Sequence, residues 1–302
     1  MSAAGSTVTA GTAAGRAGSR TGDMAAPVKL GLARGGIELR HTFTYWPDLV
    51  QALFFSGISI LVLFLMRGDH VPGTSFSLGS LTLPGIIGMN IAVGGITGVT
   101  ALLAVDREDG TLLRAKATPG GMTAYVLGKI TLTSGTALIG LVLTLILGLV
   151  AFPGLAVTAG GLLTLLWVVL LGLLATIPLG VILGSTISDP RFITLIILPF
   201  SGLTAISGIF YPITHLPGWL QGIGQVFPMY WLGLGVRAAL LPDALRVVEL
   251  GGSWRLGYVL LALAGWAAVG LLVAPRVLRR MAQRESGSRV AARRERAMLR
   301  AT

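Results

Sequence analysis

Long apolar runs constrain this chain more than any other feature of its sequence. A helix needs about 20 mostly apolar residues to cross a bilayer. Six runs of this kind contain no Asp, Glu, His, Lys or Arg: Leu49–Met66, Leu81–Val105, Ile130–Phe152, Leu162–Ile187, Phe192–Tyr211 and Leu256–Ala274. Only 12% of the 302 residues are charged, about half the usual share in a soluble domain. We therefore expect an all-α polytopic membrane protein with six transmembrane helices in residues 48–275.

The basic residues predict which ends of these spans face the cytosol, because Lys and Arg are enriched in cytoplasmic segments. If both termini are cytosolic, 19 of the 23 Lys and Arg residues lie inside. The four that lie outside are Arg67, Arg237, Arg246 and Arg255. This distribution accounts for the net charge of +11 without a nucleic-acid partner, because the basic residues do not gather on one folded face. We expect a multi-pass protein of the plasma membrane.

The two ends of the chain differ from the apolar middle. Residues 1–28 are rich in Gly, Ala, Ser and Thr and lack a signal-peptide core, so they predict a disordered tail. Residues 276–302 predict a basic cytosolic tail. Residues 29–47 mix charges with apolar and aromatic side chains, which favours an amphipathic helix in the cytosolic interface. An irregular linker is the alternative, because Gly35-Gly36 weakens a helix.

The segment between the fifth and sixth spans is apolar but irregular. Its helical pattern is interrupted by three prolines, Pro212, Pro217 and Pro228. Irregular backbone at membrane depth must be buried in protein or face water. We expect two half-helices, 216–226 and 228–241, that re-enter from the outer surface. One additional bent span is the alternative, but it would place the C-terminal arginines outside.

The sequence lacks the residues that several kinds of transport and catalytic chemistry require. Ion-coupled carriers place ionisable groups inside their spans, and none is present here. The chain has no Cys, no HExxH and no GxSxG, and its three histidines lie in predicted loops or interfaces. The phosphate-binding motif GxxxxGK[ST] is also absent. We expect no catalytic residue, metal or cofactor in this chain, although a carrier, a channel and a membrane-embedded enzyme or scaffold stay open as alternatives.

Residues 106–122 form the best-defined polar element. Four charged residues precede Gly110, and Thr111 is the expected N-cap of one or two helical turns over residues 112–117. Thr118-Pro119-Gly120-Gly121 then ends the helix. We expect Leu112 and Leu113 to be exposed and to enter a groove on a partner. The alternative is a plain connecting loop whose leucines lean on the membrane.

This loop resembles the coupling region of the type-2 ATP-binding-cassette (ABC) permease family. That region has an acidic pair, Gly-Thr-Leu, a charged residue and Thr-Pro, matched here by Glu108, Asp109, Gly110, Thr111, Leu112, Arg114, Thr118 and Pro119. Residues 207–237 also resemble the family, through Ser207-Gly208-Ile209-Phe210-Tyr211-Pro212, Leu216-Pro217-Gly218-Trp219-Leu220, Pro228 and Arg237. One departure is Leu113-Arg114, where the family often has a further acidic residue. Taken together, the resemblance covers about residues 30–275.

The resemblance implies a permease subunit of a drug exporter of the daunorubicin-resistance type, in a bacterial plasma membrane. Two permease subunits, either two copies of this chain or one copy and a paralogue, would pair with two cytosolic ATPase subunits that hold ATP and Mg. The implied coupling residues are Glu108, Asp109, Gly110, Thr111, Leu112, Leu113 and Arg114. The implied interfacial helix carries Arg34, Arg40 and Trp46. The implied outer cap carries Pro212, Pro217, Trp219, Pro228 and Arg237.

Neutral polar residues suggest what such a permease would carry. We expect the pathway to run between two copies and to include Asn90, Thr97, Ser201, Thr204 and Ser207. Gly94 and Gly98 permit close helix approach, for which ordinary packing is the alternative explanation. Hydroxyl and amide groups without charge favour a hydrophobic or amphipathic cargo such as a drug, an antibiotic or a lipid-like molecule. Efflux and antibiotic resistance are the expected roles.

Overall fold

The computed structural model describes residues 25–46, 77–152, 154–186 and 193–284, with a few single positions between 50 and 68. Most of the expected first span, Leu49–Met66, therefore lies outside the described residues. The same holds for most of the expected N-terminal tail and for the basic tail beyond Arg284.

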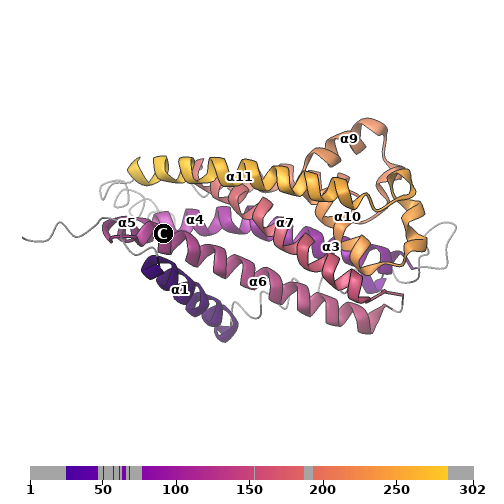
Figure 1. The fold of residues 1–302 in the computed structure, drawn as a ribbon, viewed down its shortest axis with the longest axis horizontal. Helices are drawn as coiled ribbons and strands as arrows, with labels where there is room; N and C mark the ends of the chain where they lie inside the picture. The colour runs from indigo at the N-terminus through magenta and orange to yellow at the C-terminus, as the bar shows by residue number, and fades with distance from the viewer. Residues whose placement is uncertain are drawn as a thin grey trace, which may run out of the picture.

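The elements of the described residues are helices (Figure 1). The longer ones are α1 (Ala25–Thr44), α3 (Leu78–Val93), α4 (Val99–Glu108), α5 (Thr111–Ala117), α6 (Gly121–Ala151), α7 (Ala159–Thr186), α8 (Ile193–Ile206), α9 (Gly218–Val226), α10 (Pro228–Leu240) and α11 (Leu256–Arg284). A π-helical turn, η2 (Gly94–Gly98), joins α3 to α4, and the short 3-10 helices are η4 (Ile213–His215), η5 (Asp243–Val248) and η6 (Leu250–Gly252).

Four stretches of the described chain are long and apolar enough to cross a membrane. They are Leu78–Glu108, Gly121–Ala151, Ala159–Thr186 and Leu256–Gln283, and they run along the long axis of the molecule (Figure 1). They correspond to the second, third, fourth and sixth expected spans. The fifth is represented by α8, whose 14 described residues are too few to span alone, so the total of six stays a prediction.

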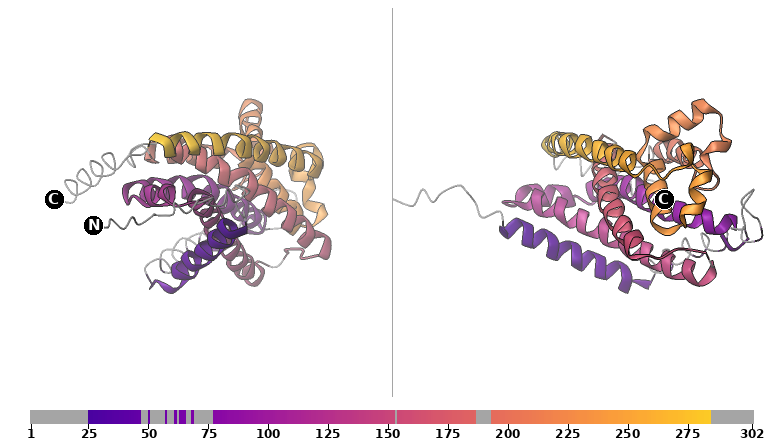
Figure 2. Two further views of the ribbon diagram at one scale, coloured as in Figure 1. Left: turned by 60° about the vertical axis from the view of Figure 1, so that its left-hand side comes forward. Right: turned by 45° about the vertical axis from the view of Figure 1, so that its right-hand side comes forward.

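The third span begins earlier than expected, at Gly121 instead of near Ile130. Its additional turns are covered by α1, which packs along α6 at the edge of the bundle (Figure 2). The contact depends on two glycines of α1. A Cβ atom on Gly31 would lie 2.7 Å from Leu127 Cβ, and one on Gly35 would lie 2.5 Å from Thr131 Cβ. The Gly35-Gly36 pair therefore does not interrupt α1. Gly35 instead lets α1 and α6 approach each other closely.

The two half-helices that the prolines predict are present as α9 and α10. Pro217 is the N-cap residue of α9 and Pro228 is the first residue of α10, positions at which the missing N–H of proline is tolerated. The Nε1 of Trp266 donates a hydrogen bond to Val226 O over 2.8 Å. Because Trp266 follows Leu256 by ten residues of α11, the α9–α10 turn lies about 15 Å along that helix. Its relation to a bilayer stays a prediction.

Helix α7 forms the centre of the bundle, in contact with α11, α10, α4 and η2. Small residues allow these contacts: a Cβ on Gly180 of α7 would lie 2.7 Å from the backbone oxygen of Ile96 of η2. The loop that carries α5 lies at one end of the bundle, and α9, α10, η5 and η6 lie toward the other (Figure 1). We call these the α5 end and the α9 end.

Candidate coupling site at the α5 end

A sharp reversal of the backbone positions α5. Helix α4 ends at Glu108, and Gly110 then adopts a left-handed conformation with φ of 71°, which glycine tolerates best. Gly110 is the N-cap residue and provides no side-chain cap. The expectation that Thr111 is the N-cap is therefore wrong. Thr111 is the first residue of α5, and its hydroxyl accepts a hydrogen bond from Arg114 Nη2 over 2.9 Å.

The expectation that both leucines of α5 are exposed is wrong for Leu112. Leu112 is only 1% exposed and belongs to the apolar core, whereas Leu113 is partly exposed. Ala115 is buried as well, so the inner face of α5 carries positions i and i+3 of the helix. Arg114 and Lys116 are exposed. A partner at this end can reach Leu113 and Arg114 but not Leu112.

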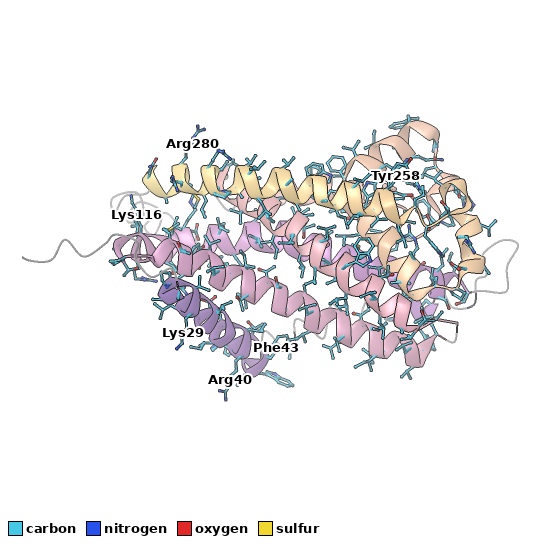
Figure 3. The ribbon with its side chains drawn as sticks, viewed as in Figure 1. Lys29, Arg40, Phe43, Lys116, Tyr258 and Arg280 are labelled. Atoms are coloured by element: carbon cyan, nitrogen blue, oxygen red, sulfur yellow. The ribbon has the colours of Figure 1, made fainter. Side chains whose placement is uncertain are left out.

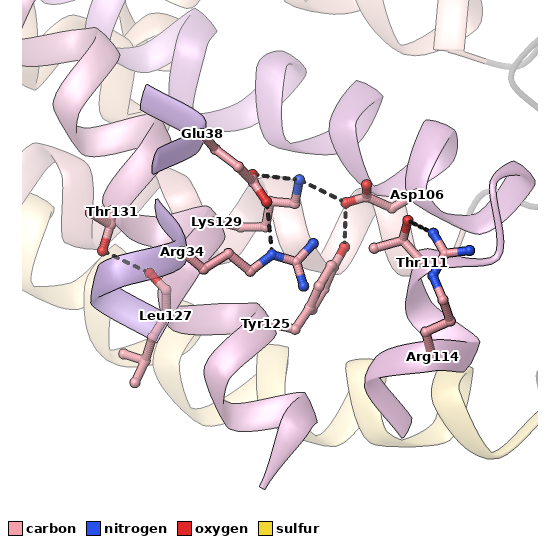
Figure 4. Close-up of polar contacts among 9 residues, drawn as sticks. All are labelled: Arg34, Glu38, Asp106, Thr111, Arg114, Tyr125, Leu127, Lys129 and Thr131. Carbon is pink, nitrogen blue, oxygen red and sulfur yellow. Dashed lines mark hydrogen bonds and ion pairs between the residues drawn. The ribbon is translucent and has the colours of Figure 1, made fainter. Parts of the chain in front are cut away.

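A charge network joins α1, α4 and α6 beside this loop (Figure 4). Lys129 Nζ on α6 lies 3.1 Å from Glu38 Oε2 on α1 and 3.0 Å from Asp106 Oδ2 on α4. Arg34 Nε lies 2.8 Å from Glu38 Oε1. The hydroxyl of Tyr125 donates to Asp106 Oδ2 over 2.8 Å. One ammonium group therefore bridges carboxylates on two other helices.

The ring of Tyr125 adds a second layer of contacts to this network. The Arg34 guanidinium carbon and Lys129 Nζ each lie 5.9 Å from its centroid, within the range of cation–π attraction. Tyr125, Lys129 and Asp106 are largely buried, so water screens these charges little. The roles of Glu38, Tyr125 and Lys129 were not among those predicted from the sequence. The available signal was Tyr125 and Lys129 at positions i and i+4 of one helix.

The pKa of Glu38 makes the contact between α1 and α6 sensitive to acid. Burial raises this pKa, but the hydrogen bonds and positive charges of Arg34 and Lys129 outweigh burial and hold it below its ordinary value. The stabilisation is complete above the ordinary value of about 4.3 and is lost as the pH falls through the lowered value. We therefore expect the contact between α1 and α6 to weaken in acid, as the pH falls below the ordinary pKa of a glutamate.

Spin labels on cysteines introduced at Leu30 of α1 and Lys116 of α5 would report this weakening as a longer and broader distance distribution. The natural chain has no Cys, so only these two positions are labelled. Glu38→Gln should remove the acid-dependent step. An identical transition in the Gln variant would assign the step to another group.

An open groove of about 410 Å³ lies between the start of α1, helix α5 and the start of α6. Its walls are Pro27, Leu30, Arg34, Thr111, Arg114, Ala115, Thr118, Pro119, Gly120, Gly121 and Ala124. Most of these residues are small or apolar, and the only charged ones are the two arginines. The groove therefore suits a short segment of a partner that presents apolar side chains together with an acidic group.

Other residues of the expected interfacial helix point away from this groove. Lys29 and Arg40 extend outward from α1 (Figure 3), and Trp46 is exposed. Leu32 and Ile37 are exposed apolar residues of α1 that do not line the groove. Lipid contact would cover such side chains, and the interfacial position of α1 stays a prediction.

The expected cap residues lie at the α9 end, far from the groove (Figure 1). Pro212 and Pro228 are buried, while Pro217 and Trp219 are exposed. Arg237, expected as an outside charge, is 1% exposed, and its Nε lies 2.6 Å from Oε1 of Glu249, which is 3% exposed. Arg237 Nη1 also donates to Gly208 O over 3.0 Å. Glu249 was not among the residues predicted from the sequence.

The structure does not gather all of the expected pathway residues. Asn90 is exposed and Thr97 is partly exposed. Thr204 and Ser207 are buried, and their hydroxyls donate to Phe200 O and Thr204 O of the same helix. The side chain of Ser201 lies outside the described residues. Across the part of the chain that the structure describes, no three His, Cys, Asp or Glu side chains group to hold a metal.

Comparison with known proteins gives one result that bears on this site. Residues 69–274 match the profile of a family described as ABC-2 family transporter protein. The matched range includes α5 and the charged residues of α4 and α6. Helix α1 precedes it. No curated protein matches the chain.

Proposed function

Because the chain belongs to the ABC-2 transporter family, whose members are membrane components of transporters, we propose that it is the permease subunit of a bacterial ABC exporter. In this proposal it moves a hydrophobic or amphipathic compound across the plasma membrane, as drug efflux requires. A separate cytosolic ATPase subunit hydrolyses ATP with Mg and drives the movement. Two ATPase copies would act on two permease subunits.

The groove at the α5 end carries this proposal. It is bounded by the loop whose sequence resembles the family's coupling region, and it offers Arg34 and Arg114 to an acidic group. Its floor connects to the bundle through α6, on which Tyr125 and Lys129 hold Asp106 of α4. In this proposal, a displacement of α5 is transmitted to α4 and α6 through buried contacts. We take this end to be cytosolic, in accord with the positive charges of the adjacent segments.

The cargo path would follow the open face of the second span. Asn90 and Thr97 lie on this face, and the Cβ positions of Gly94 and Gly98 meet nothing within 4 Å. A second copy of the chain placed against this face would enclose a neutral pathway with amide and hydroxyl groups. Such a lining favours uncharged or amphipathic molecules, because it offers hydrogen bonds without a buried charge.

Two charge reversals on α5 test the docking of the ATPase. Arg114 lines the groove, whereas Lys116 is exposed on the same helix outside it. Arg114→Glu should lower the Mg-ATPase activity that co-purifies with the tagged chain about tenfold, the equivalent of 1.4 kcal/mol. Lys116→Glu should leave it within about twofold, as expected for a solvated charge.

Equal effects of the two reversals would contradict docking in this groove. Absence of ATPase activity from the natural chain, purified gently from its own membranes, would contradict the transporter assignment itself. Leu112→Asp is not a clean test, because Leu112 is buried and its replacement would disturb the packing of α5.

A further inference from the structure

The second span is not one regular α-helix. Helix α3 ends at Val93, five residues from Gly94 to Gly98 form the π-helical turn η2, and α4 continues from Val99. A π turn is rare and is found frequently at functional sites. It accommodates an additional residue and weakens the regular hydrogen-bond ladder, so it is a natural position for a bend.

The three glycines of η2 have different surroundings. A Cβ on Gly95 would lie 2.2 Å from Thr176 Oγ1 of α7, so Gly95 is needed for helix packing. A Cβ on Gly94 or on Gly98 would meet none of the described residues within 4 Å. Packing against the described residues therefore explains Gly95 but does not explain Gly94 or Gly98. Both weaken α-helical structure relative to alanine.

The two sides of η2 share α7 as a neighbour, but they differ in the helix against which each packs most extensively. Helix α3 packs on α10, where Gly88 lies against the backbone of Gly233. Helix α4 packs on α7, and its last turn carries Asp106, which Lys129 and Tyr125 hold at the coupling site. The α3 side is therefore tied to the α9 end of the molecule, and the α4 side is tied to the loop that carries α5.

Threonine hydroxyls donate hydrogen bonds to backbone carbonyl groups around the turn. Thr97 Oγ1 donates to Val93 O over 2.8 Å. Thr100 Oγ1 lies 2.7 Å from Ile96 O and 3.2 Å from Gly180 O of α7. Hydroxyls bonded in this way to preceding carbonyls bend helices. They also provide donors to carbonyls when the backbone hydrogen bonds rearrange.

We propose that η2 is a hinge at which α4, together with α5, moves relative to α3. The open space at Gly94 and Gly98 lets the helix bend on the face that carries Asn90 and Thr97. Movement of α4 then changes the spacing between Asn90 above the hinge and Thr97 within it. This inference rests on the proposed function only for what drives the movement. The backbone geometry of η2 does not depend on an ATPase.

The double substitution Gly94→Ala/Gly98→Ala tests the hinge, because both methyl groups enter open space. The matched control is Gly140→Ala/Gly265→Ala, two glycines of regular helices α6 and α11 whose Cβ positions also meet nothing within 4 Å. Hydrogen exchange of the purified chain needs no ATPase. Amides of residues 94–98 should exchange at least about tenfold faster than those of 83–90, and the hinge double variant should slow them about tenfold. The control should leave them unchanged.

Transport in vesicles is the second readout, with a dye such as ethidium as the probe. The hinge variant should lower ATP-dependent dye transport at least about fivefold, with oligomeric state and ATPase binding retained, and the control should not. Slow exchange of residues 94–98 in the natural chain, or unchanged transport in the hinge variant, would overturn the hinge. Loss of the oligomer in that variant would assign the glycines to an interface and would also overturn it. If the natural chain binds no ATPase, the proposed function fails, while hydrogen exchange still decides the hinge.

Discussion

Replacing Arg237 with methionine is expected to destabilise the α9 end of the molecule by about 3–5 kcal/mol. Arg237 and Glu249 are almost completely buried, with 2.6 Å between Nε and Oε1. Without the guanidinium, the Glu249 carboxylate is left buried without its partner, and Gly208 O loses the donor that lies 3.0 Å away. Thermal unfolding in detergent, followed by tryptophan fluorescence, would measure the loss.

Two comparisons show whether the cause is the unpaired charge. Arg246→Met breaks the Arg246–Asp243 pair at the same end of the molecule, but both side chains are mostly exposed and 3.5 Å apart, so we expect less than about 1 kcal/mol. The double variant Arg237→Met/Glu249→Leu removes both charges and should regain most of the stability, because no buried charge is left unpaired. A single variant as stable as the natural chain would contradict the buried pair.

The second large effect is expected at Lys129. Lys129→Met leaves Glu38 and Asp106 without the cation that lies 3.1 Å and 3.0 Å from their oxygens. We expect a loss of about 2–4 kcal/mol, near the range for breaking a buried ion pair, and loss of ATP-dependent transport. Thermal unfolding and vesicle transport would measure the two effects separately.

The control for Lys129 is Tyr125→Phe, which removes one hydrogen bond to Asp106 and leaves the charges in place. We expect it to cost about 1 kcal/mol and to retain transport. Lys129→Arg keeps the positive charge, so its loss of stability should fall between those of Lys129→Met and Tyr125→Phe. If Lys129→Met transports as well as Tyr125→Phe, the bridge between α1 and α4 does not transmit motion.

Structural features that depend on local composition could be predicted from the sequence. Apolar runs predicted the four long helices, because a bilayer-length run leaves few other structures open. Pro217 and Pro228 marked the starts of α9 and α10, because proline fixes φ and lacks an N–H donor. The helical stretch after Gly110 was also predictable from its turn residues.

Features that depend on distant contacts were not predictable. Lys129 and Glu38 are 91 positions apart, and their contact requires the glycine-mediated approach of α1 to α6. Leu112 was expected to be exposed because charges flank it, but α5 turns that side chain into the core. The π turn at η2 left no trace in the pattern of residues, because a helix that is apolar all round has no polar face to show a shift in register.

If the groove at the α5 end docks an ATPase, as proposed above, its composition has a consequence for cells that contain several related permeases. Most of its wall consists of proline, glycine, alanine, leucine and threonine, and its only charges are Arg34 and Arg114. Such a surface would fit many helices of similar shape, so the two guanidinium groups would have to provide most of the discrimination between rival ATPases. Exchanging these two positions between paralogous permeases should redirect each to the other's motor.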